Sequence, residues 1–254
     1  MGIEALLRGV ARRRPTAQRD GQRASVRLNK YGGVFSVPEG TKQYAIAEEG
    51  SYYVAHTGQT GVAMSPATAF AATNPFVLVA HSCPSTDDPN VPSIYLDRLV
   101  MEVSSAGSVS TQALAVALVL DFGNRYLSGG TPAVAVPVNL NAPTQQSVAQ
   151  VYYGNITATA PTQVAVQVVG MLNLDASNVL LVAGSRYVLN FGTAEQVHTA
   201  TQVGVGTNVL TYIEIPIPPM VVGPGQSMLA MLWEPGSTVT TPPSLRPHLS
   251  WWER

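Results

Sequence analysis

Short runs with the two-residue periodicity of β-strands follow one another from residue 25 onward, and no helical periodicity persists among them. The alternation is clearest in Asn208–Ile217, where Val209, Thr211 and three isoleucines would line one face of a strand. Strands at this spacing without intervening helices indicate a sandwich or a barrel, and the length of 254 residues favours a jelly-roll-like β-sandwich. We therefore predict an all-β fold with strands at Ser25–Leu28, Gln43–Ala47, Ser51–Ala55, Phe76–His81, Ile94–Ser104, Gln112–Phe122, Val148–Ile156, Gln163–Leu172, Val179–Val182, Arg186–Phe191, Asn208–Ile217, Ser227–Trp233 and Leu249–Trp252.

Glycine and proline separate these runs. Gly-Gly steps stand at positions 32–33 and 129–130, and Pro-Gly or Gly-Pro steps stand at 223–225 and 235–236. Such dipeptides are typical of turns because they supply the backbone conformations that turns need. We therefore predict a turn at each of these positions.

Two of the runs, Leu114–Leu120 and Met228–Trp233, are apolar at every position. A two-sheet sandwich buries only one face of each strand, so the second face of each run needs another cover. That cover is either a loop of the same chain or a neighbouring subunit, and the sequence leaves both open.

Aromatic doublets recur at Tyr52-Tyr53, Tyr152-Tyr153 and Trp251-Trp252. Adjacent side chains on a strand point to opposite faces, so each doublet should place one ring in the core and one outside. The outer rings would serve as edge packing, as subunit contacts or as stacking surfaces for sugars. The candidates for a subunit interface are Tyr53, Tyr153, Trp233, Trp251 and Trp252.

The charges of the chain are concentrated at one end. Eight of the fourteen lysines and arginines lie in the first thirty residues, which have a net charge of +6 against −7 for the remaining 224. Charged residues make up only 11% of the chain, compared with about 25% in a typical soluble domain. So sparsely charged a surface favours association with copies or partners. We predict a basic N-terminal arm over residues 1–30 and a single jelly-roll domain over residues 31–254.

The arm begins with an amphipathic pattern, because Ile3, Leu6, Leu7 and Val10 fall on one helical face before Pro15. So short a helix is marginal alone in water and would become ordered on docking. The cations could meet an acidic protein surface, nucleic acid or an anionic membrane, unless the arm is simply a solvated tail. We predict a protein partner ahead of nucleic acid, and no membrane partner. The residues expected to bind a partner are Ile3, Leu6, Leu7, Arg8, Val10, Arg12, Arg13, Arg14, Arg19, Arg23 and Arg27.

No catalytic motif is present. The histidines at 56, 81, 198 and 248 lack metal-ligand spacing, and Glu48-Glu49 would diverge on a strand. Asp87-Asp88 lies in a proline-rich loop without a calcium motif, and Cys83 has no partner for a disulfide. Serine-hydrolase, P-loop and dinucleotide fingerprints are also missing. We expect a non-enzymatic protein without cofactor or metal, made in a cytoplasm without a secretory signal or a membrane-spanning helix.

Several stretches resemble a family of phage-encoded virion proteins. They are Tyr31–Gly40, the Gly123–Tyr126 turn, Tyr187–Gly192, Pro218–Ser227 and Trp251–Arg254. The resemblance covers most of the chain from Asn29 onward. It implies a single jelly-roll protein, a homotrimer that decorates or cements the head of a tailed phage.

This resemblance implies a place on the capsid surface, with the major capsid protein or another virion protein as partner. Cementing would need no chemistry, because it bridges neighbouring shell subunits. Three other classes remain open: a shell-forming jelly roll with a genome-facing arm, a glycan-binding tail or receptor module, and a carbohydrate-active sandwich enzyme.

Overall fold

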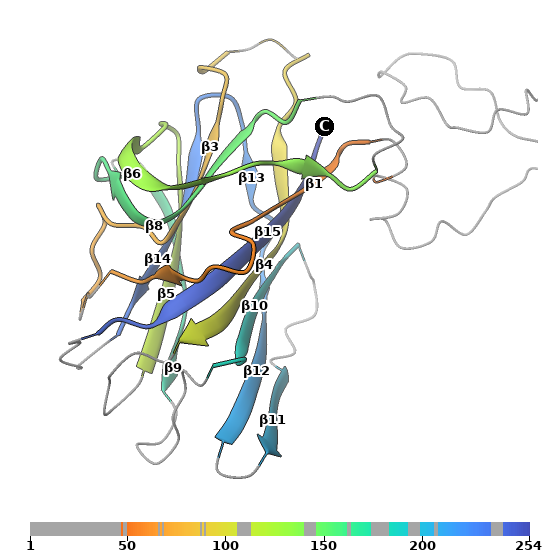
Figure 1. Ribbon diagram of the computed structural model, residues 1–254. Coiled ribbons are helices and arrows are strands. Elements are labelled where there is room, and N and C mark those ends of the chain that lie inside the picture. The colour runs from red at the N-terminus through yellow and green to blue at the C-terminus, as the bar shows by residue number, and fades with distance from the viewer. Residues whose placement is uncertain are drawn as a thin grey trace, which may run out of the picture. The chain divides into compact units, whose positions relative to one another are not determined.

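A computed structural model of the chain describes residues 47, 50–65, 67, 69–86, 88, 90–105, 113–139, 146–161, 164–173, 183–192, 199–205, 208–234 and 241–254 (Figure 1). The chain divides into two compact units, Met1–Tyr52 with Pro137–Gln145 and Tyr53–Val136 with Gln146–Arg254. In the smaller unit the amide of Val138 donates to the carbonyl of Tyr52 at 3.0 Å. The predicted arm and the predicted strands Ser25–Leu28 and Val179–Val182 lie outside the described residues, as does all of Gln43–Ala47 except Ala47. The predicted boundary between arm and domain stays a prediction.

The described residues form two β-sheets that face each other in a sandwich-like arrangement, which confirms the predicted all-β class. The nine-stranded sheet has the order β11-β12-β10-β4-β15-β1-β7, with β13 paired to β4 and β2 to β15. The six-stranded sheet has the order β6-β8-β3-β14-β5-β9. The strands are β1 (Tyr52–His56), β2 (Val62–Ala63), β3 (Val77–His81), β4 (Ile94–Ser105), β5 (Ala113–Asp121), β6 (Tyr126–Ala133), β7 (Val136–Pro137), β8 (Ala149–Ala158), β9 (Val164–Asn173), β10 (Arg186–Phe191), β11 (Thr199–Val205), β12 (Asn208–Ile217), β13 (Val221–Val222), β14 (Ser227–Trp233) and β15 (Ser244–Glu253).

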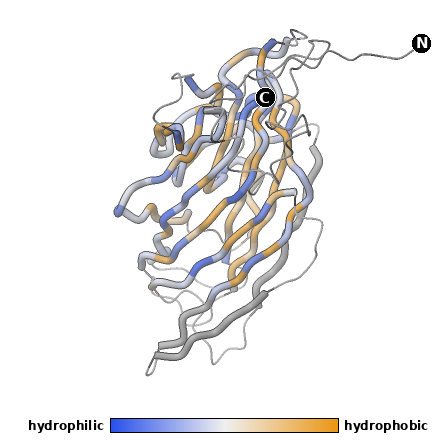
Figure 2. Tube along the Cα trace, turned by 90° about the vertical axis from the view of Figure 1, so that its right-hand side faces the viewer, coloured by the Kyte–Doolittle hydropathy of each residue, from blue (hydrophilic) through white to orange (hydrophobic). Residues whose placement is uncertain are grey.

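The main core lies between the two sheets and follows from the alternation of apolar residues. On β12 the side chains of Ile213, Ile215 and Ile217 are buried, as the sequence predicts. They lie beside Tyr187 and Leu189 of β10, which pairs with β12 in parallel. Hydrophobic stretches, orange in Figure 2, accordingly run along the strands. Burying each large apolar side chain contributes about 1.5–3 kcal/mol.

Three tyrosines, Tyr53, Tyr153 and Tyr187, are buried in this core. The Tyr153 hydroxyl donates to the carbonyl of Ala55 at 2.9 Å and so links the two sheets. Burial raises the pKa of the Tyr153 and Tyr187 hydroxyls. Burial, together with the nearby Glu253 carboxylate, raises the pKa of Tyr53 to about 12. All three hydroxyls therefore stay neutral at physiological pH.

The predicted turn at Gly129-Gly130 is wrong, because both glycines lie within strand β6. They adopt φ values of +75° and +73°, and the pairing of β6 with β8 shifts register on either side of Gly129. A Cβ on Gly129 would come within 2.5 Å of the Asn155 carbonyl oxygen. The glycines therefore make a bulged edge strand possible and do not end one.

Two other predictions meet different outcomes. The turn at 223–225 is confirmed, with Gly225 at φ +75° and the Gln226 amide donating to the Gly223 carbonyl at 3.0 Å. Strand β15, however, begins at Ser244 and not at Leu249, because it continues through Pro247, opposite Met101 of β4. The predicted turns at 32–33 and 235–236 lie outside the described residues.

Candidate interaction surfaces

The outer face of the six-stranded sheet carries a second apolar cluster. Its members are buried residues of opposite parity to the main core, namely Leu78, Ala80, Ala117, Val119, Ile156, Ala158, Leu229 and Met231. Their burial answers the question of what covers the second face of the two fully apolar runs. Both runs are covered within the chain itself from Leu114 to Val119 and from Met228 to Leu232. A neighbouring subunit is therefore not needed to bury them.

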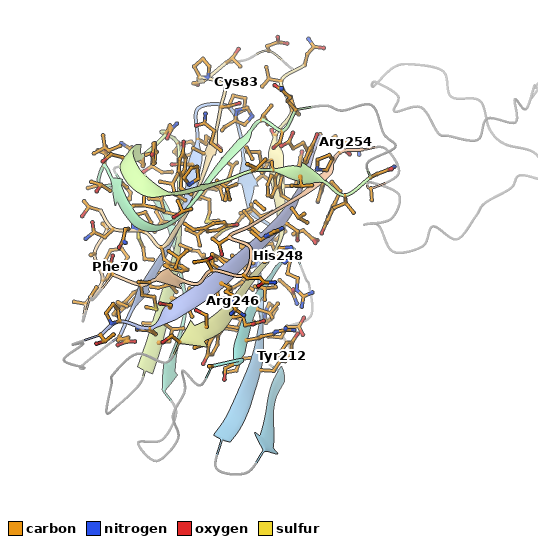
Figure 3. All side chains as sticks on the ribbon, in the orientation of Figure 1. Phe70, Cys83, Tyr212, Arg246, His248 and Arg254 are labelled. Atoms are coloured by element: carbon orange, nitrogen blue, oxygen red, sulfur yellow. The ribbon has the colours of Figure 1, made fainter. Side chains whose placement is uncertain are left out.

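Four aromatic side chains lie at this face, and we call Phe70, Tyr126, Tyr152 and Trp233 the aromatic patch. Tyr126, Tyr152 and Trp233 are half-buried and pack against the apolar cluster. The rings of Tyr126 and Tyr152 stack at 3.9 Å, and Phe70 meets Trp233 edge-on at 5.6 Å. Phe70 is 46% exposed and lies at the left of the view in Figure 3, away from Tyr212.

The strands of this sheet contain only two acidic or basic residues, His81 and Asp121, and both are buried. Nδ1 of His81 accepts a hydrogen bond from the Cys83 amide at 3.1 Å, so Nε2 carries the proton and donates to the Pro92 carbonyl at 2.8 Å. The Asp121 carboxylate binds Arg125 at 2.7 Å. These side chains hold loops in place, and none gives the outer face a charge.

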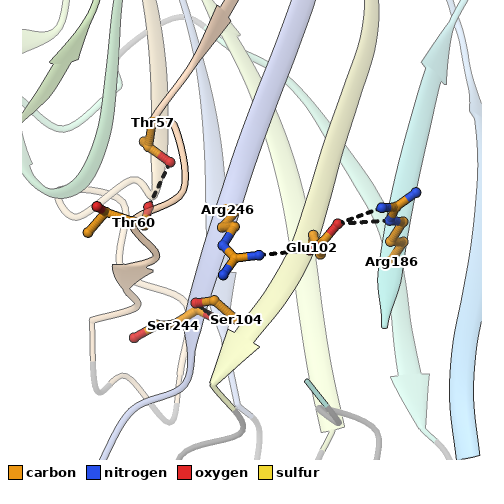
Figure 4. A network of polar contacts seen from close by, with 7 residues as sticks. All are labelled: Thr57, Thr60, Glu102, Ser104, Arg186, Ser244 and Arg246. Carbon is orange, nitrogen blue, oxygen red and sulfur yellow. Dashed lines mark hydrogen bonds and ion pairs between the residues drawn. The ribbon is translucent and has the colours of Figure 1, made fainter. Parts of the chain in front are cut away.

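The outer face of the nine-stranded sheet is ionic. Glu102 of β4 binds Arg186 of β10 at 2.8 Å and Arg246 of β15 at 3.0 Å, so one carboxylate joins three adjacent strands (Figure 4). We call these three residues the ionic network. Exposed cross-strand pairs of this kind contribute about 0.2–1 kcal/mol each.

Further polar groups surround the ionic network. Glu214 accepts hydrogen bonds from Asn190 and, at 3.4 Å, from the Tyr212 hydroxyl. His248 lies edge-on to His56, with ring centroids 6.2 Å apart. Burial, followed by the positive fields of His56 and Arg98, lowers the pKa of His248. This face therefore holds groups of both signs together with a histidine, His248, whose pKa is lowered.

Two buried glutamates stand in different surroundings. Glu253 accepts hydrogen bonds from the Ser147 hydroxyl at 2.5 Å, the Val148 amide at 3.1 Å and Trp251 Nε1 at 3.0 Å. Glu234 follows directly after β14 and is only 1% exposed, and neither carboxylate oxygen has a hydrogen-bonding partner in the described part of the chain. Burial raises the pKa of Glu234.

The aromatic doublets divide as the sequence predicts, with Tyr53, Tyr153 and Trp251 in the core and their neighbours half-buried. The prediction of Tyr53, Tyr153 and Trp251 as interface residues is therefore wrong, because their rings fill the sandwich and cannot meet another subunit. Trp233 and Trp252 keep partly exposed rings and stay candidates; Trp252 stacks on Tyr95 at 3.9 Å.

The predicted partner-binding residues of the arm, from Ile3 to Arg27, lie outside the described residues. Within the part of the chain that the structure describes, no three His, Cys, Asp or Glu side chains are grouped to hold a metal ion. Asp88 accepts from the Asn90 amide at 2.9 Å in an exposed loop. No helix among the described residues is long and apolar enough to span a membrane.

Comparison with protein-family models, with curated proteins and with solved structures finds no match to this chain. The surfaces must therefore be interpreted from their own chemistry. Sequence patterns did not single out Phe70 or Glu234. Phe70 lies in a run of small residues without periodicity, but Glu234 had a usable signal: it is the only acidic or basic residue between Glu214 and Arg246.

Proposed function

We propose that this chain is a non-enzymatic structural protein of a virion, a jelly-roll decoration or cement protein that attaches to the capsid shell. In this proposal the basic arm binds the shell, and the aromatic patch provides contacts between subunits of a homotrimer. Each shell subunit must then break additional contacts before it can leave, which stabilises the head.

The pairing of eight strands is the observation that carries the fold assignment. In chain order these strands are β1, β3, β4, β5, β9, β10, β14 and β15. β1 pairs with β15, β3 with β14, β4 with β10 and β5 with β9, so the outermost strands of this chain order pair with each other and so on inward. A folded-over hairpin with this nested pairing supports a jelly roll, in which β6–β8 extends one sheet and β11–β12 the other. Viral capsid proteins are prominent users of this architecture, although lectins and cupins share it, so the role must rest on surfaces.

Two features of the surfaces support the structural role. The six-stranded sheet presents an aromatic patch with no acidic or basic residue exposed on its strands, and aromatic residues are enriched at the centres of protein interfaces. The sequence adds an arm of net charge +6. A cationic strap on a weakly charged body suits attachment to an acidic shell surface.

A shell-forming capsid protein is the second candidate, favoured by the same arm. Eight cations within thirty residues would also neutralise packaged nucleic acid. The two candidates differ in what the arm binds, so one set of samples distinguishes them.

The deciding experiment measures mass by light scattering and binding to emptied heads of the encoding phage, for the full chain and for a chain lacking residues 1–23. We expect trimers from both, and head binding by the full chain alone. Large particles that contain nucleic acid and dissociate with salt would favour the shell-forming candidate. Head binding by the truncated chain would contradict a role for the arm, and a monomeric full chain would contradict the trimer.

The aromatic patch is tested separately by replacing Phe70 with serine. We expect Phe70→Ser to weaken trimer formation at least tenfold, since partly exposed aromatic residues dominate interface energies. Tyr212→Ser is the matched control, because Tyr212 is a half-buried aromatic residue on the opposite sheet. An equal effect of both substitutions would remove the patch from the proposal.

A further inference from the structure

Glu234 is a buried carboxyl group that finds no hydrogen-bonding partner among the described residues. Its amide donates to the Ala67 carbonyl at 2.9 Å, which fixes the backbone where β14 ends. The side chain is 1% exposed, and both oxygens lack hydrogen-bond donors in the part of the chain that the structure describes. Glu253, in contrast, is also buried, at 7% exposed, but is surrounded by donors. Buried polar groups are usually satisfied, so this exception requires a physical reason.

The described segments next to Glu234 offer no counter-charge. The segment Met64–Phe76, which supplies Ala67 and Phe70, contains no acidic or basic residue. On β5 and β3, the two strands that pair with β14, the only acidic or basic groups are Asp121 and His81, both at the Ser227 end of β14. Asp121 lies opposite Ser227, seven residues from Glu234 along β14, which is on the order of 20 Å away. Asp121 is itself neutralised by Arg125.

We propose that Glu234 is a proton-binding switch: its carboxyl group is neutral where it is buried at the end of β14, next to Ala67, and loss of the proton opens this corner of the fold. An ionised carboxylate that is buried without donors or counter-charge is strongly destabilised. The charged form therefore gains by moving into water, and the segment that carries it must loosen. The switch rests on burial and surroundings, and does not depend on the proposed role in a virion.

The direction of the pH effect follows from linkage. Burial raises the pKa of Glu234 above its ordinary value of 4.5. At a pH between the ordinary pKa of the open state and the raised pKa of the closed state, Glu234 has released its proton in the open state but keeps it in the closed state. Opening therefore becomes more favourable as the pH rises above 4.5, and the effect levels off once the closed state also ionises.

The test measures hydrogen exchange at the residue-234 amide of the full chain between about pH 4 and pH 8, corrected for the intrinsic rate. In the wild type we expect the protection factor to fall by up to tenfold per pH unit within the titration window. In Glu234→Gln, which keeps the shape but cannot ionise, it should stay constant. The Gly192 amide, bonded to the Ile217 carbonyl at 2.8 Å, is the internal control and should not respond.

A second measurement keeps the proposal testable if the glutamine variant does not fold. The ¹³C shift of the Glu234 side-chain carboxyl in the wild type should titrate with a midpoint above 4.5. A midpoint at or below this value would overturn the proposal. So would a protection factor that changes equally with pH in the wild type and in Glu234→Gln.

Discussion

The outer faces of the two sheets differ in how they meet water. On the six-stranded sheet, apolar residues such as Leu78 and Leu229 are buried beneath the aromatic patch, so the sheet has a second core. On the nine-stranded sheet, the ionic network pairs charges across strands. Glu102 and Arg246 are half-buried in it, and Arg186 is exposed. The first face is held by apolar burial, whereas the second is held by charges that water screens. The same sandwich therefore combines a face whose stability does not depend on charge screening with one that responds to salt screening and pH.

The largest expected effect tests the second core. Leu229→Ala should lower the free energy of unfolding by about 2–5 kcal/mol, because Leu229 is fully buried although it points away from the main core. Val100→Ala is the matched control, since Val100 is a half-buried aliphatic residue on the outer face of the other sheet. Urea unfolding measures both. Equal losses would mean that the two outer faces do not differ in this way.

The next effect concerns the edge of the six-stranded sheet. Gly129→Ala should cost about 1–3 kcal/mol, because it combines a positive φ with a Cβ that meets the Asn155 carbonyl oxygen at 2.5 Å. Gly58→Ala provides the control, with a φ of +73° and no atom within 4 Å of the added Cβ. The difference in thermal unfolding between the two variants isolates the close approach. No difference would indicate that β6 moves away from β8 without cost.

A smaller effect is expected from the ionic network. Glu102→Gln removes both ion pairs and should lower the free energy of unfolding by about 0.5–1 kcal/mol at low salt. The loss should shrink as sodium chloride is raised from about 0.05 M to about 1 M, because salt screens exposed pairs. Urea unfolding at both salt concentrations checks this. A loss that is independent of salt would show that packing of the Glu102 side chain, and not its charge, matters.

The smallest effect is the proton sensitivity of His248. The folded state holds the pKa of His248 below 6.5, through burial and the neighbouring His56 and Arg98. The unfolded state therefore takes up a proton first as the pH falls through 6.5, and stability is lost toward acid. Thermal unfolding between about pH 7.5 and pH 5 should show a weaker acid loss for His248→Gln than for the wild type. If the unfolding temperature falls equally with pH in the wild type and in His248→Gln, the lowered pKa of His248 does not affect stability, and the prediction is wrong.

Periodicity was enough to predict much of the fold. Alternating residues place strands at Arg186–Phe191 and Asn208–Ile217 with the same bounds that the structure has. The turn predicted from the Gly-Gly dipeptide at 129–130 was wrong, because a pair of glycines is common to turns and to bulged strands. Periodicity failed at the start of β15 because Pro247 interrupts the pattern but not the strand.

The surfaces were harder to predict than the strands. Alternation shows that adjacent rings of a doublet point to opposite faces, but it does not show which face is the core. The interface prediction therefore chose Tyr53 and Tyr153 on the wrong side. Phe70 reaches Trp233 through tertiary packing from a segment without periodicity, so no local pattern indicates it.

The central position of β15 has a consequence for biosynthesis. Strand β4 is hydrogen-bonded to β15, and Ser104 and Ser244, which also bond each other, are separated by 140 positions in the chain. At typical rates of translation, roughly 10–30 s pass between the emergence of the two segments. During that interval β4 has no β15 beside it, and the Tyr53 ring, which stacks on Trp251 in the folded protein, is open to other chains. Assembly of the sandwich is thus timed by its final strand, and a pause before residue 244 would prolong the period in which nascent chains can pair wrongly.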